Sequence, residues 1–265
     1  MVSIKEYKTV SSLEEAYALN QKKGNKIIGG MCWLKMQKKN INIAIDLSQL
    51  GLDTIIENET SFKIGAMVTL RDLETHTGIK NFFGDGIENS LCHIVGTQFR
   101  NCATVGGSIH MRFGFSDILT SLMALNADVE LFDKGIIPLR EYAHTFSNND
   151  ILVNIILKKE NIKMKYMSLR NSYSDLPVLA VAISEKDERY SAVVSARPSK
   201  AKIIYDTENI LIGEITEEKA TAFGTYVANN LDFGSNNRGS AAYRKHLCKV
   251  LVKRCILAIN GGTQK

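Results

Sequence analysis

The sequence predicts an α+β fold, in which groups of strands and groups of helices occupy different stretches of the chain. Three observations support this class. Residues 1–50 combine short strand-like apolar runs with one helix. Beyond residue 163, three strand-like runs follow one another and two helices come after them. Between the two halves, Lys158–Lys163 (KKENIK) is a polar stretch without glycine or proline, which indicates a domain boundary.

Local signals justify the elements of residues 1–75. Apolar runs and apolar alternation predict strands at 2–7, 26–28, 41–47 and 62–66. Ser11–Glu15 provides a capping box, with a hydroxyl at the N-cap and a carboxylate three residues on, for a helix to about Lys23. Thr69 is expected to cap a short helix that runs through Thr75.

The remaining elements follow from the same signals. Helices are expected at 86–95, at 118–125 after a cap by Ser116 or Asp117, from Glu217 to about Asn230 and from Ser240 to about Ile259. Strands are expected at 128–132, 150–157, 166–169, 178–183 and 189–196. Residues 136–142 are expected to form a turn into a short helix, and the last five residues to fray.

Composition places the chain among ordinary globular proteins. Its 265 residues are 45% apolar and 23% charged, enough to bury a large core in one or two domains. The net charge of +5 is spread without a run of five like charges, which argues against nucleic-acid binding. No apolar run reaches the length of a membrane span, and the N-terminus lacks the apolar core of a signal peptide. We therefore expect a cytoplasmic protein.

The cysteines are expected to be reduced thiols. They are odd in number and include no CxxC pair, so a disulfide framework, a zinc site and an iron–sulfur cluster held by this chain are all disfavoured. The five positions are Cys32, Cys92, Cys102, Cys248 and Cys255.

Two glycine pairs are the candidate ligand-binding features. Gly29-Gly30 and Gly106-Gly107 each follow a short apolar run, and glycine lets main-chain amides approach a ligand because it has no Cβ. Exposed amides commonly bind phosphate, so two such turns can clasp a diphosphate from both sides. The alternative is that both pairs form tight turns without a ligand. Neither pair fits a Walker A loop or the GxGxxG dinucleotide fingerprint.

Other residues near the pairs have two interpretations each. Asp117 can accept a hydrogen bond from a ligand hydroxyl or amide, or cap the helix that follows it. His110 can contact a ligand, and Arg100 and Arg112 can balance phosphate charge, but structural and solvated roles are the alternatives. Aromatic residues that can stack on a flavin, or simply fill the core, are Trp33, Tyr166 and Tyr173.

The glycine pairs resemble two motifs of the FAD-binding subunit of the molybdenum hydroxylases, the family that includes xanthine dehydrogenase and carbon monoxide dehydrogenase. The first motif has the form AGGTD or AGGHS after a strand and stands here as Ile28–Cys32 (IGGMC). The second has the form A-T-[IV]-G-G-N with an upstream Arg-Asn and stands as Arg100–Ser108 (RNCATVGGS). Asp117 lies ten residues after its second glycine, as in the family.

The resemblance extends into the second half of the chain. Arg170 followed by Asp175–Val178 (DLPV) is similar to a family pattern in which an arginine is followed a few residues later by D-[FL]-P-V. Arg238–Arg244 (RGSAAYR) is similar to the family's RGSAEYR helix start. The four motifs occur in the family's order between residues 26 and 255, and therefore cover nearly the whole chain.

The resemblance implies the domain organisation. It implies an FAD-binding domain at 1–158 of the two-part, vanillyl-alcohol-oxidase-like type, with subdomains at about 1–54 and 55–158. A small C-terminal α+β domain is implied at 163–262.

The implied function is that of a flavoprotein oxidoreductase subunit, similar to that of xanthine dehydrogenase, in a heteromeric complex. It would take electrons from [2Fe-2S] clusters of a small partner subunit and pass them to NAD⁺ or another acceptor. Substrate oxidation would occur on a molybdopterin-binding large subunit. A flavin-less scaffold subunit of the same assembly and a stand-alone flavin oxidase are the alternatives.

Position within the motifs implies which residues bind FAD, non-covalently, and no residue of this chain is assigned a catalytic or metal-binding role. The implied contacts are Ile27, Ile28, Gly29, Gly30, Met31, Cys32, Trp33, Ala103, Thr104, Gly106, Gly107, Ser108, Asp117 and Leu152. Met31 and Cys32 depart from the family's Thr-Asp or His-Ser, and Ser108 replaces its usual asparagine. A lysine common in the family is absent at the position of Met167, where Lys163 or Lys165 is a candidate substitute.

Overall fold

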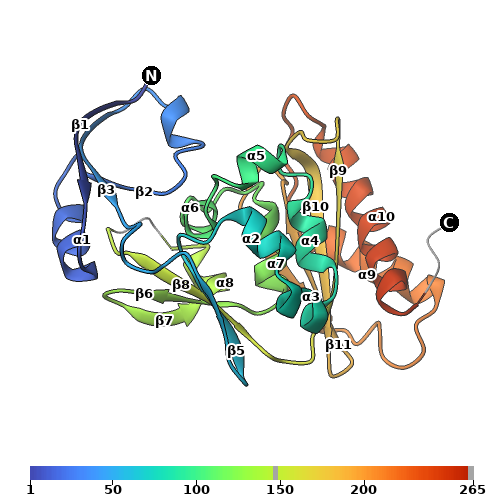
Figure 1. Ribbon diagram of the computed structural model, residues 1–265. Coiled ribbons are helices and arrows are strands. Elements are labelled where there is room, and N and C mark those ends of the chain that lie inside the picture. The colour runs from blue at the N-terminus through green and yellow to red at the C-terminus, as the bar shows by residue number, and fades with distance from the viewer. Residues whose placement is uncertain (146–148, 262–265) are drawn as a thin grey trace. The chain divides into compact units, whose positions relative to one another are not determined.

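The computed structural model, drawn as a ribbon in Figure 1, describes residues 1–145 and 149–261. The chain divides into two compact units. Unit 1 comprises residues 1–73, 97–111 and 127–158, and unit 2 comprises residues 74–96, 112–126 and 159–265. Each unit is thus assembled from three separate segments of the chain. Residue 262, the expected end of the C-terminal domain, and most of the segment expected to fray lie outside the described residues.

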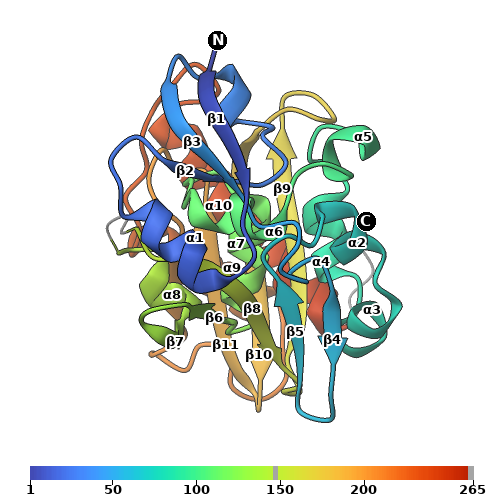
Figure 2. The ribbon, with the colours of Figure 1, turned by 60° about the vertical axis from the view of Figure 1, so that its left-hand side comes forward.

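Unit 1 begins with a three-stranded parallel sheet of strand order β1-β3-β2, whose strands lie side by side in Figure 2. Its elements are β1 (Ser3–Thr9), α1 (Leu13–Asn20), β2 (Lys26–Ile28), the 3-10 helix η1 (Leu34–Met36) and β3 (Asn40–Asp46). Ile28 is in register with Asp46. Because parallel strands end at the same edge of a sheet, the loop after Ile28 leaves from the edge where β3 also ends.

The capping box predicted for α1 is confirmed. The Ser12 hydroxyl accepts a hydrogen bond from the Glu15 amide at 3.1 Å, and the Glu15 carboxylate accepts one from the Ser11 amide at 3.0 Å. The helix ends at Asn20, three residues before the expected end. Ala16 faces an apolar cluster that also contains Val10, Ile45 and Leu47, so α1 is held by one buried face.

The second sheet of unit 1 is antiparallel, with strand order β4-β5-β8-β6-β7. Its strands are β4 (Ile55–Glu57), β5 (Ser61–Gly65), β6 (Asp128–Leu131), β7 (Gly135–Pro138) and β8 (Leu152–Lys158). The accompanying helices are α2 (Leu70–Thr75), whose last two residues belong to unit 2, α5 (Thr97–Arg100), α6 (Val105–His110) and α8 (Leu139–Tyr142). The turn expected at 136–138 is wrong, because these residues pair with β6 as strand β7.

Unit 2 contains a four-stranded antiparallel meander of order β12-β11-β10-β9. Its elements are α3 (Thr77–Phe83), α4 (Gly86–Leu91), α7 (Asp117–Ala124), β9 (Lys163–Arg170), β10 (Pro177–Lys186), β11 (Arg189–Ser195), β12 (Lys202–Tyr205), α9 (Glu217–Asn229) and α10 (Ala241–Ile259). In Figure 1, α9 and α10 cover one side of this sheet, and α4 and α7 cover the other. Helices on both sides explain why β10 is buried over its first eight residues.

The apolar core of unit 2 lies between this sheet and α9 and α10. It is built from alternate residues of the strands and from one stripe of each helix. Its members include Val181, Ile183, Val194, Phe223, Val227, Leu251 and Ile256. This packing confirms the strands and the two long helices expected for the second half of the chain.

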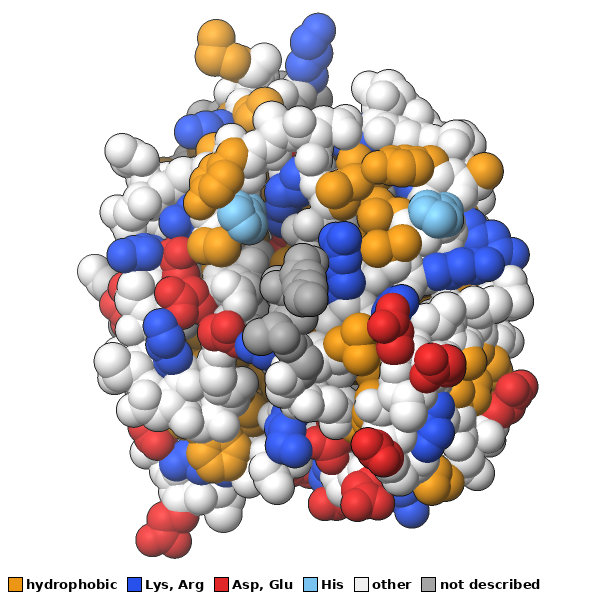
Figure 3. Space-filling view, turned by 90° about the vertical axis from the view of Figure 1, so that its right-hand side faces the viewer, with side chains coloured by type: hydrophobic (Ala, Val, Ile, Leu, Met, Phe, Trp, Pro, Cys, Tyr) orange, Lys and Arg blue, Asp and Glu red, His pale blue; other side chains and the backbone are white. Residues whose placement is uncertain are grey.

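Basic and acidic side chains are interspersed over the face shown in Figure 3, and acidic ones gather toward its lower edge. Orange hydrophobic side chains lie between them in small groups. No helix within the described ranges is long and apolar enough to cross a bilayer.

Candidate functional site

A cleft of about 360 Å³ lies within unit 1, at the carboxyl end of β2. This volume falls in the range of small-molecule and cofactor sites. All the FAD contacts implied by the sequence motifs except Asp117 line the cleft. These residues are Ile27, Ile28, Gly29, Gly30, Met31, Cys32, Trp33, Ala103, Thr104, Gly106, Gly107, Ser108 and Leu152.

The loop after β2 presents main-chain donors to this cleft. The amides of Gly30, Met31 and Cys32 have no hydrogen-bond acceptor among the described residues. Met31 adopts φ +57°, the left-handed region that few residues other than glycine occupy. Successive amides around a left-handed residue form a concave, anion-binding surface. The loop therefore fits the diphosphate of a dinucleotide.

The two glycine-containing segments pack directly on each other. A Cβ on Gly30 would lie 1.6 Å from the Cys102 carbonyl oxygen, and one on Gly29 would lie 2.5 Å from the Thr104 hydroxyl oxygen. Both distances are far below van der Waals contact. Glycine is therefore needed at positions 29 and 30 so that the two segments can pack together. This packing requirement is separate from any role of these glycines in letting a ligand approach the main chain.

The second glycine pair is not a turn, as the sequence had suggested, but lies in the first turn of α6. Thr104 caps this helix, and its hydroxyl accepts from the Gly107 amide at 3.2 Å. The Val105 and Gly106 amides donate to the carbonyls of Val68 and Ala66, both at 2.8 Å. All three amides are used inside the protein, so Gly106 and Gly107 themselves offer no free main-chain donor.

Close packing explains the glycine at position 106. A Cβ there would lie 2.6 Å from both the Cβ and the carbonyl oxygen of Ala66. Gly106 therefore lets α6 lie against the chain that follows β5. Thr104, a residue type favoured at helix N-caps, was the available signal for a helix N-terminus, and the glycine pair obscured it.

The opposite wall of the cleft depends on Asp150, which the sequence analysis missed. Its carboxylate accepts from the amides of Asp133, Lys134 and Ile151 at 3.0, 3.2 and 2.7 Å. These bonds join the turn between β6 and β7 to the start of β8, and so position Leu152 in the cleft wall. An acidic residue just before an apolar strand was the only signal in the sequence.

Two basic residues of the cleft were also missed. Lys26 and Lys39 line it, and neither ammonium has a carboxylate partner within the described parts of the chain. Both are exposed. Their charge favours an anionic ligand next to the free loop amides.

His110 and Cys32 also line the cleft. His110 Nδ1 lies 3.0 Å from the Tyr142 hydroxyl, which holds the imidazole ring in place. Burial, and next the neighbouring Cys102, raise the pKa of the Cys32 thiol. Cys32 is therefore a protonated thiol at neutral pH.

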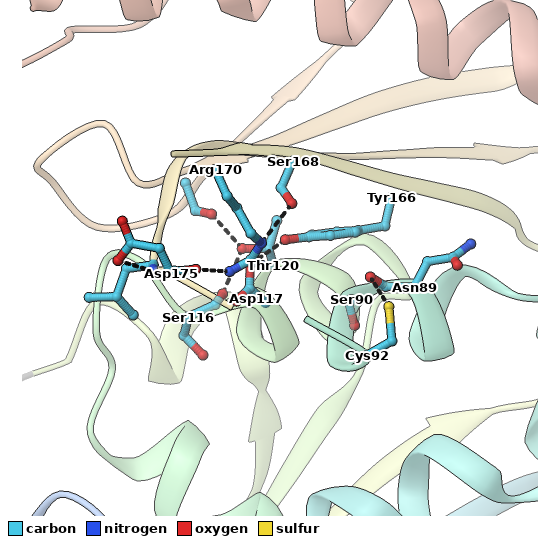
Figure 4. Close-up of polar contacts among 12 residues, drawn as sticks. Asn89, Ser90, Cys92, Ser116, Asp117, Thr120, Tyr166, Ser168, Arg170 and Asp175 are labelled. Atoms are coloured by element: carbon cyan, nitrogen blue, oxygen red, sulfur yellow. Dashed lines mark hydrogen bonds and ion pairs between the residues drawn. The ribbon is translucent and has the colours of Figure 1, made fainter. Parts of the chain in front are cut away.

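Asp117 belongs to unit 2 and is the first residue of α7, which Ser116 caps through the Leu119 amide. Figure 4 shows Tyr166 and Arg170 pointing toward its carboxylate from β9. The Tyr166 hydroxyl and the Arg170 guanidinium both donate to Oδ1, the latter at 2.7 Å. No described residue donates to Oδ2, so this oxygen retains its capacity to accept a hydrogen bond.

The ionisation of this cluster is set by burial and by its internal charges. Burial disfavours charge on Arg170, but the Asp117 carboxylate outweighs it and the guanidinium pKa is raised. Burial and then the charge of Asp117 raise the pKa of Tyr166 well above its ordinary value. Tyr166 therefore stays a neutral donor, and Arg170 a cation, over the whole physiological range.

The candidate substitutes for the family's lysine are occupied elsewhere. Lys165 pairs with Asp85 at 2.7 Å and Lys163 with Glu185 at 3.1 Å. Met167 packs against the apolar core of the sheet in unit 2, on the strand face opposite to Tyr166 and Arg170.

Two family models cover nearly the whole chain. The model described as "FAD binding domain in molybdopterin dehydrogenase" matches residues 3–159. The model described as "CO dehydrogenase flavoprotein C-terminal domain" matches residues 165–259.

Individual proteins agree with these matches. The chain is 26% identical to the uncharacterized protein YgfM of Escherichia coli strain K12, over 79% of this chain and 77% of that protein. It is 25% identical to the nicotine 6-hydroxylase medium subunit of Paenarthrobacter nicotinovorans, over 97% and 98% of the two chains.

Its fold is similar to that of a chain in the carbon monoxide dehydrogenase of Hydrogenophaga pseudoflava, with a TM-score of 0.87, 21% identity and 98% coverage of both chains. This likeness establishes the two-domain fold. The family-model matches, which span both halves of the sequence, establish the family. The chain belongs to the family of FAD-binding domains in molybdopterin dehydrogenases and is an FAD-binding medium subunit of the molybdenum hydroxylase family.

Proposed function

We propose that this chain is the electron-transfer subunit of a heteromeric, cytoplasmic molybdenum hydroxylase. In this proposal it takes electrons from [2Fe-2S] clusters of a small subunit and passes them to NAD⁺ or another acceptor. Oxidation of the substrate then takes place on a molybdopterin-binding large subunit. The observation that carries the proposal is the cleft at the carboxyl end of β2. Among the described residues, its loop amides have no acceptor and its two lysines have no carboxylate partner.

The residues proposed to bind FAD suit it in three ways. The amides of Gly30, Met31 and Cys32 would hold the diphosphate, and Lys26 and Lys39 would offset its charge. The main chain at Leu152 would contact the flavin edge. Asp117 Oδ2 would accept a hydrogen bond from the cofactor. Bound FAD supplies the electron-carrying chemistry that protein side chains lack.

Two features of the chain orient these groups. Gly30 allows the loop after β2 to rest on Cys102, which holds the loop amides in one arrangement before the ligand arrives. Arg170 and Tyr166 fix Asp117 Oδ1 and thereby the direction of Oδ2. Such preorganisation lowers the entropic cost of binding.

The departures at Met31, Cys32 and Met167 favour one alternative, a scaffold subunit that keeps the fold without flavin. Main-chain amide contacts do not depend on side-chain identity, which argues against this alternative. A stand-alone flavin oxidase is the other alternative, and it predicts substrate turnover by the isolated chain.

Reconstitution with FAD tests the proposal. We expect the purified chain to bind FAD in a one-to-one ratio, measured by flavin absorbance after gel filtration. When the chain is co-expressed with molybdopterin-binding and [2Fe-2S] subunits, we expect a stable complex in which added substrate bleaches the flavin absorbance before NAD⁺ or an artificial acceptor is reduced.

Each other outcome identifies an alternative. A stable three-subunit complex with no flavin would support the scaffold. Turnover with oxygen or NAD⁺ by the isolated, FAD-loaded chain would support the stand-alone oxidase.

A further inference from the structure

A second pocket lies wholly within unit 2, where β10 begins, β11 ends and α10 starts. Its volume is about 330 Å³. Phe115, Leu176 and Pro177 give it apolar walls, and Lys200, Arg238 and Arg244 give it three cations. The function proposed above makes no use of this pocket.

Positive charge around the pocket exceeds negative charge. Arg244 is only 1% exposed, and its guanidinium donates solely to neutral oxygens, those of Val178, Gly234, Gly239 and Asn236. Arg197, adjacent to the lining residues Ala196 and Pro198, is 6% exposed and donates to the main-chain carbonyls of Asp232 and Lys200.

Within the described residues, Asp175 supplies the one carboxylate that contacts any of these four cations, at 3.2 Å from Arg238 Nη2. Burial lowers the pKa of the Arg197 guanidinium, and burial together with Arg238 lowers that of Arg244. Buried cations are normally paired with an anion because removing them from water is costly. The excess charge therefore points to an anionic ligand.

The pocket also carries hydrogen-bond donors without acceptors. In the described part of the chain, no acceptor contacts Lys200 Nζ, Arg238 Nη1, the Ser199 hydroxyl or Asn236 Nδ2, and all four residues line the pocket. The buried Nε atoms of Arg197 and Arg238 are unpartnered as well. Ammonium, guanidinium, hydroxyl and amide donors together suit the several oxygens of a phosphate or carboxylate group.

We propose that this pocket binds a small molecule through a phosphate or carboxylate group held by Lys200, Arg238, Ser199 and Asn236. Arg244 contributes through its charge, since its own donors are already used. The apolar walls accommodate the uncharged part of the ligand. This site is separate from the proposed FAD site, because none of its lining residues is among those proposed to bind FAD.

Calorimetric titration of the full chain, loaded with FAD so that the cleft of unit 1 is filled, tests the proposal. The probes are inorganic phosphate, pyrophosphate and acetate at constant ionic strength. We expect saturable binding of one equivalent. If the phosphates bind more strongly, the site is assigned to phosphate-bearing ligands. If acetate binds more strongly, the site is assigned to carboxylate-bearing ligands.

Two variants and one control locate the site. Lys200→Ala and Arg238→Gln should each weaken the binding about tenfold, the effect of losing one charge-assisted hydrogen bond. Lys202→Ala removes the same charge from β12, outside the pocket, and should change the affinity less than twofold. Lys200 is exposed and only its main-chain carbonyl is used in the fold, so its variant should remain folded, as far-UV circular dichroism would verify.

Three results would overturn the proposal. They are an absence of saturable binding to the FAD-loaded chain, binding to the FAD-free chain that added FAD displaces, and binding that neither Lys200→Ala nor Arg238→Gln weakens. Displacement by FAD would place the anion in the cleft of unit 1 instead.

Discussion

Gly30 is the residue at which the two halves of the cleft meet. A methyl group there would overlap the Cys102 carbonyl oxygen, and main-chain atoms cannot move aside without displacing both segments. Gly30→Ala should therefore destabilise the protein by at least the upper end of the ~1–3 kcal/mol typical of overpacking. It should also weaken FAD binding. Urea unfolding and flavin titration measure the two effects.

Gly107 provides the matched comparison. It lies in the same cleft, but a Cβ there would meet only the Thr104 hydroxyl oxygen, at 3.0 Å. Alanine is also favoured over glycine in a helix by about 0.5–1 kcal/mol. Gly107→Ala should thus leave the urea midpoint nearly unchanged. An equal loss of stability in both variants would contradict the packing argument.

Lys26 tests the electrostatic part of the cleft. Its charge has no carboxylate partner among the described residues, so an approaching diphosphate meets an uncompensated cation. Lys26→Gln should weaken FAD binding by roughly 1 kcal/mol, a factor of about five. Lys23→Gln, three residues earlier and outside the cleft, is the control. Flavin fluorescence titration at low and high salt should show the difference shrink as salt rises.

At the scale of elements, α1 offers a test of pH dependence. The Lys8 ammonium and then the Ser11 amide lower the pKa of Glu15 to about 2, from an ordinary 4.5. A carboxyl group whose pKa is lower in the folded state stabilises the protein above its unfolded pKa, and loses this effect as pH falls through the folded pKa. Glu15→Gln should therefore show a flatter dependence of unfolding free energy on pH between about 4.5 and 2.

The control for Glu15 is Glu14→Gln in the same helical turn, because Glu14 is exposed and forms no ion pair within the described chain. Urea denaturation at a series of pH values compares the variants. If the unfolding free energies of the wild type and Glu15→Gln depended on pH in the same way, the Lys8–Glu15 pair would not contribute to stability as proposed.

Polar contacts connect the N-terminus of α7 to segments that are distant in the sequence. Asp117 is joined to β9 through Arg170, and Arg170 Nη1 donates to the Asp175 carbonyl at 2.6 Å. The Asp175 carboxylate in turn contacts Arg238 before α10. Residues of three sequence motifs, Asp117, Arg170 and Arg238, thus belong to one connected polar network in the structure. The spacing of the motifs along the sequence did not reveal this connection.

Sequence reasoning succeeded for elements whose signals are local. The cap of α1, the strand β5 and the two long C-terminal helices follow from a capping box, apolar alternation and an amphipathic stripe. It failed at α6, where the closeness of Ala66 rather than turn formation demands glycine at position 106. That reason lies in a segment forty residues away, so no local pattern expresses it.

At the scale of the whole molecule, the predicted α+β class and the family are confirmed. The sequence did not predict that unit 2 contains segments from the first half of the chain. The apolar faces of α4 and α7 show that these helices are buried, but not which of the two cores they pack against. The residues expected to bind FAD, other than Asp117, line one cleft. Within the described residues the Gly30 amide has no acceptor, whereas the Gly106 and Gly107 amides are bonded inside the protein. Whether each named residue contacts FAD remains a prediction.

The interleaved segments also bear on how the protein is made. Unit 2 takes α4 and α7 from the first half of the chain, whereas its sheet comes from residues 163–205. During translation, these two helices therefore leave the ribosome before the strands that later cover them have been synthesised. All eight residues of α7 are buried in the finished protein. During synthesis this helix is the exposed apolar segment that we expect a chaperone to bind until β10 and β11 emerge.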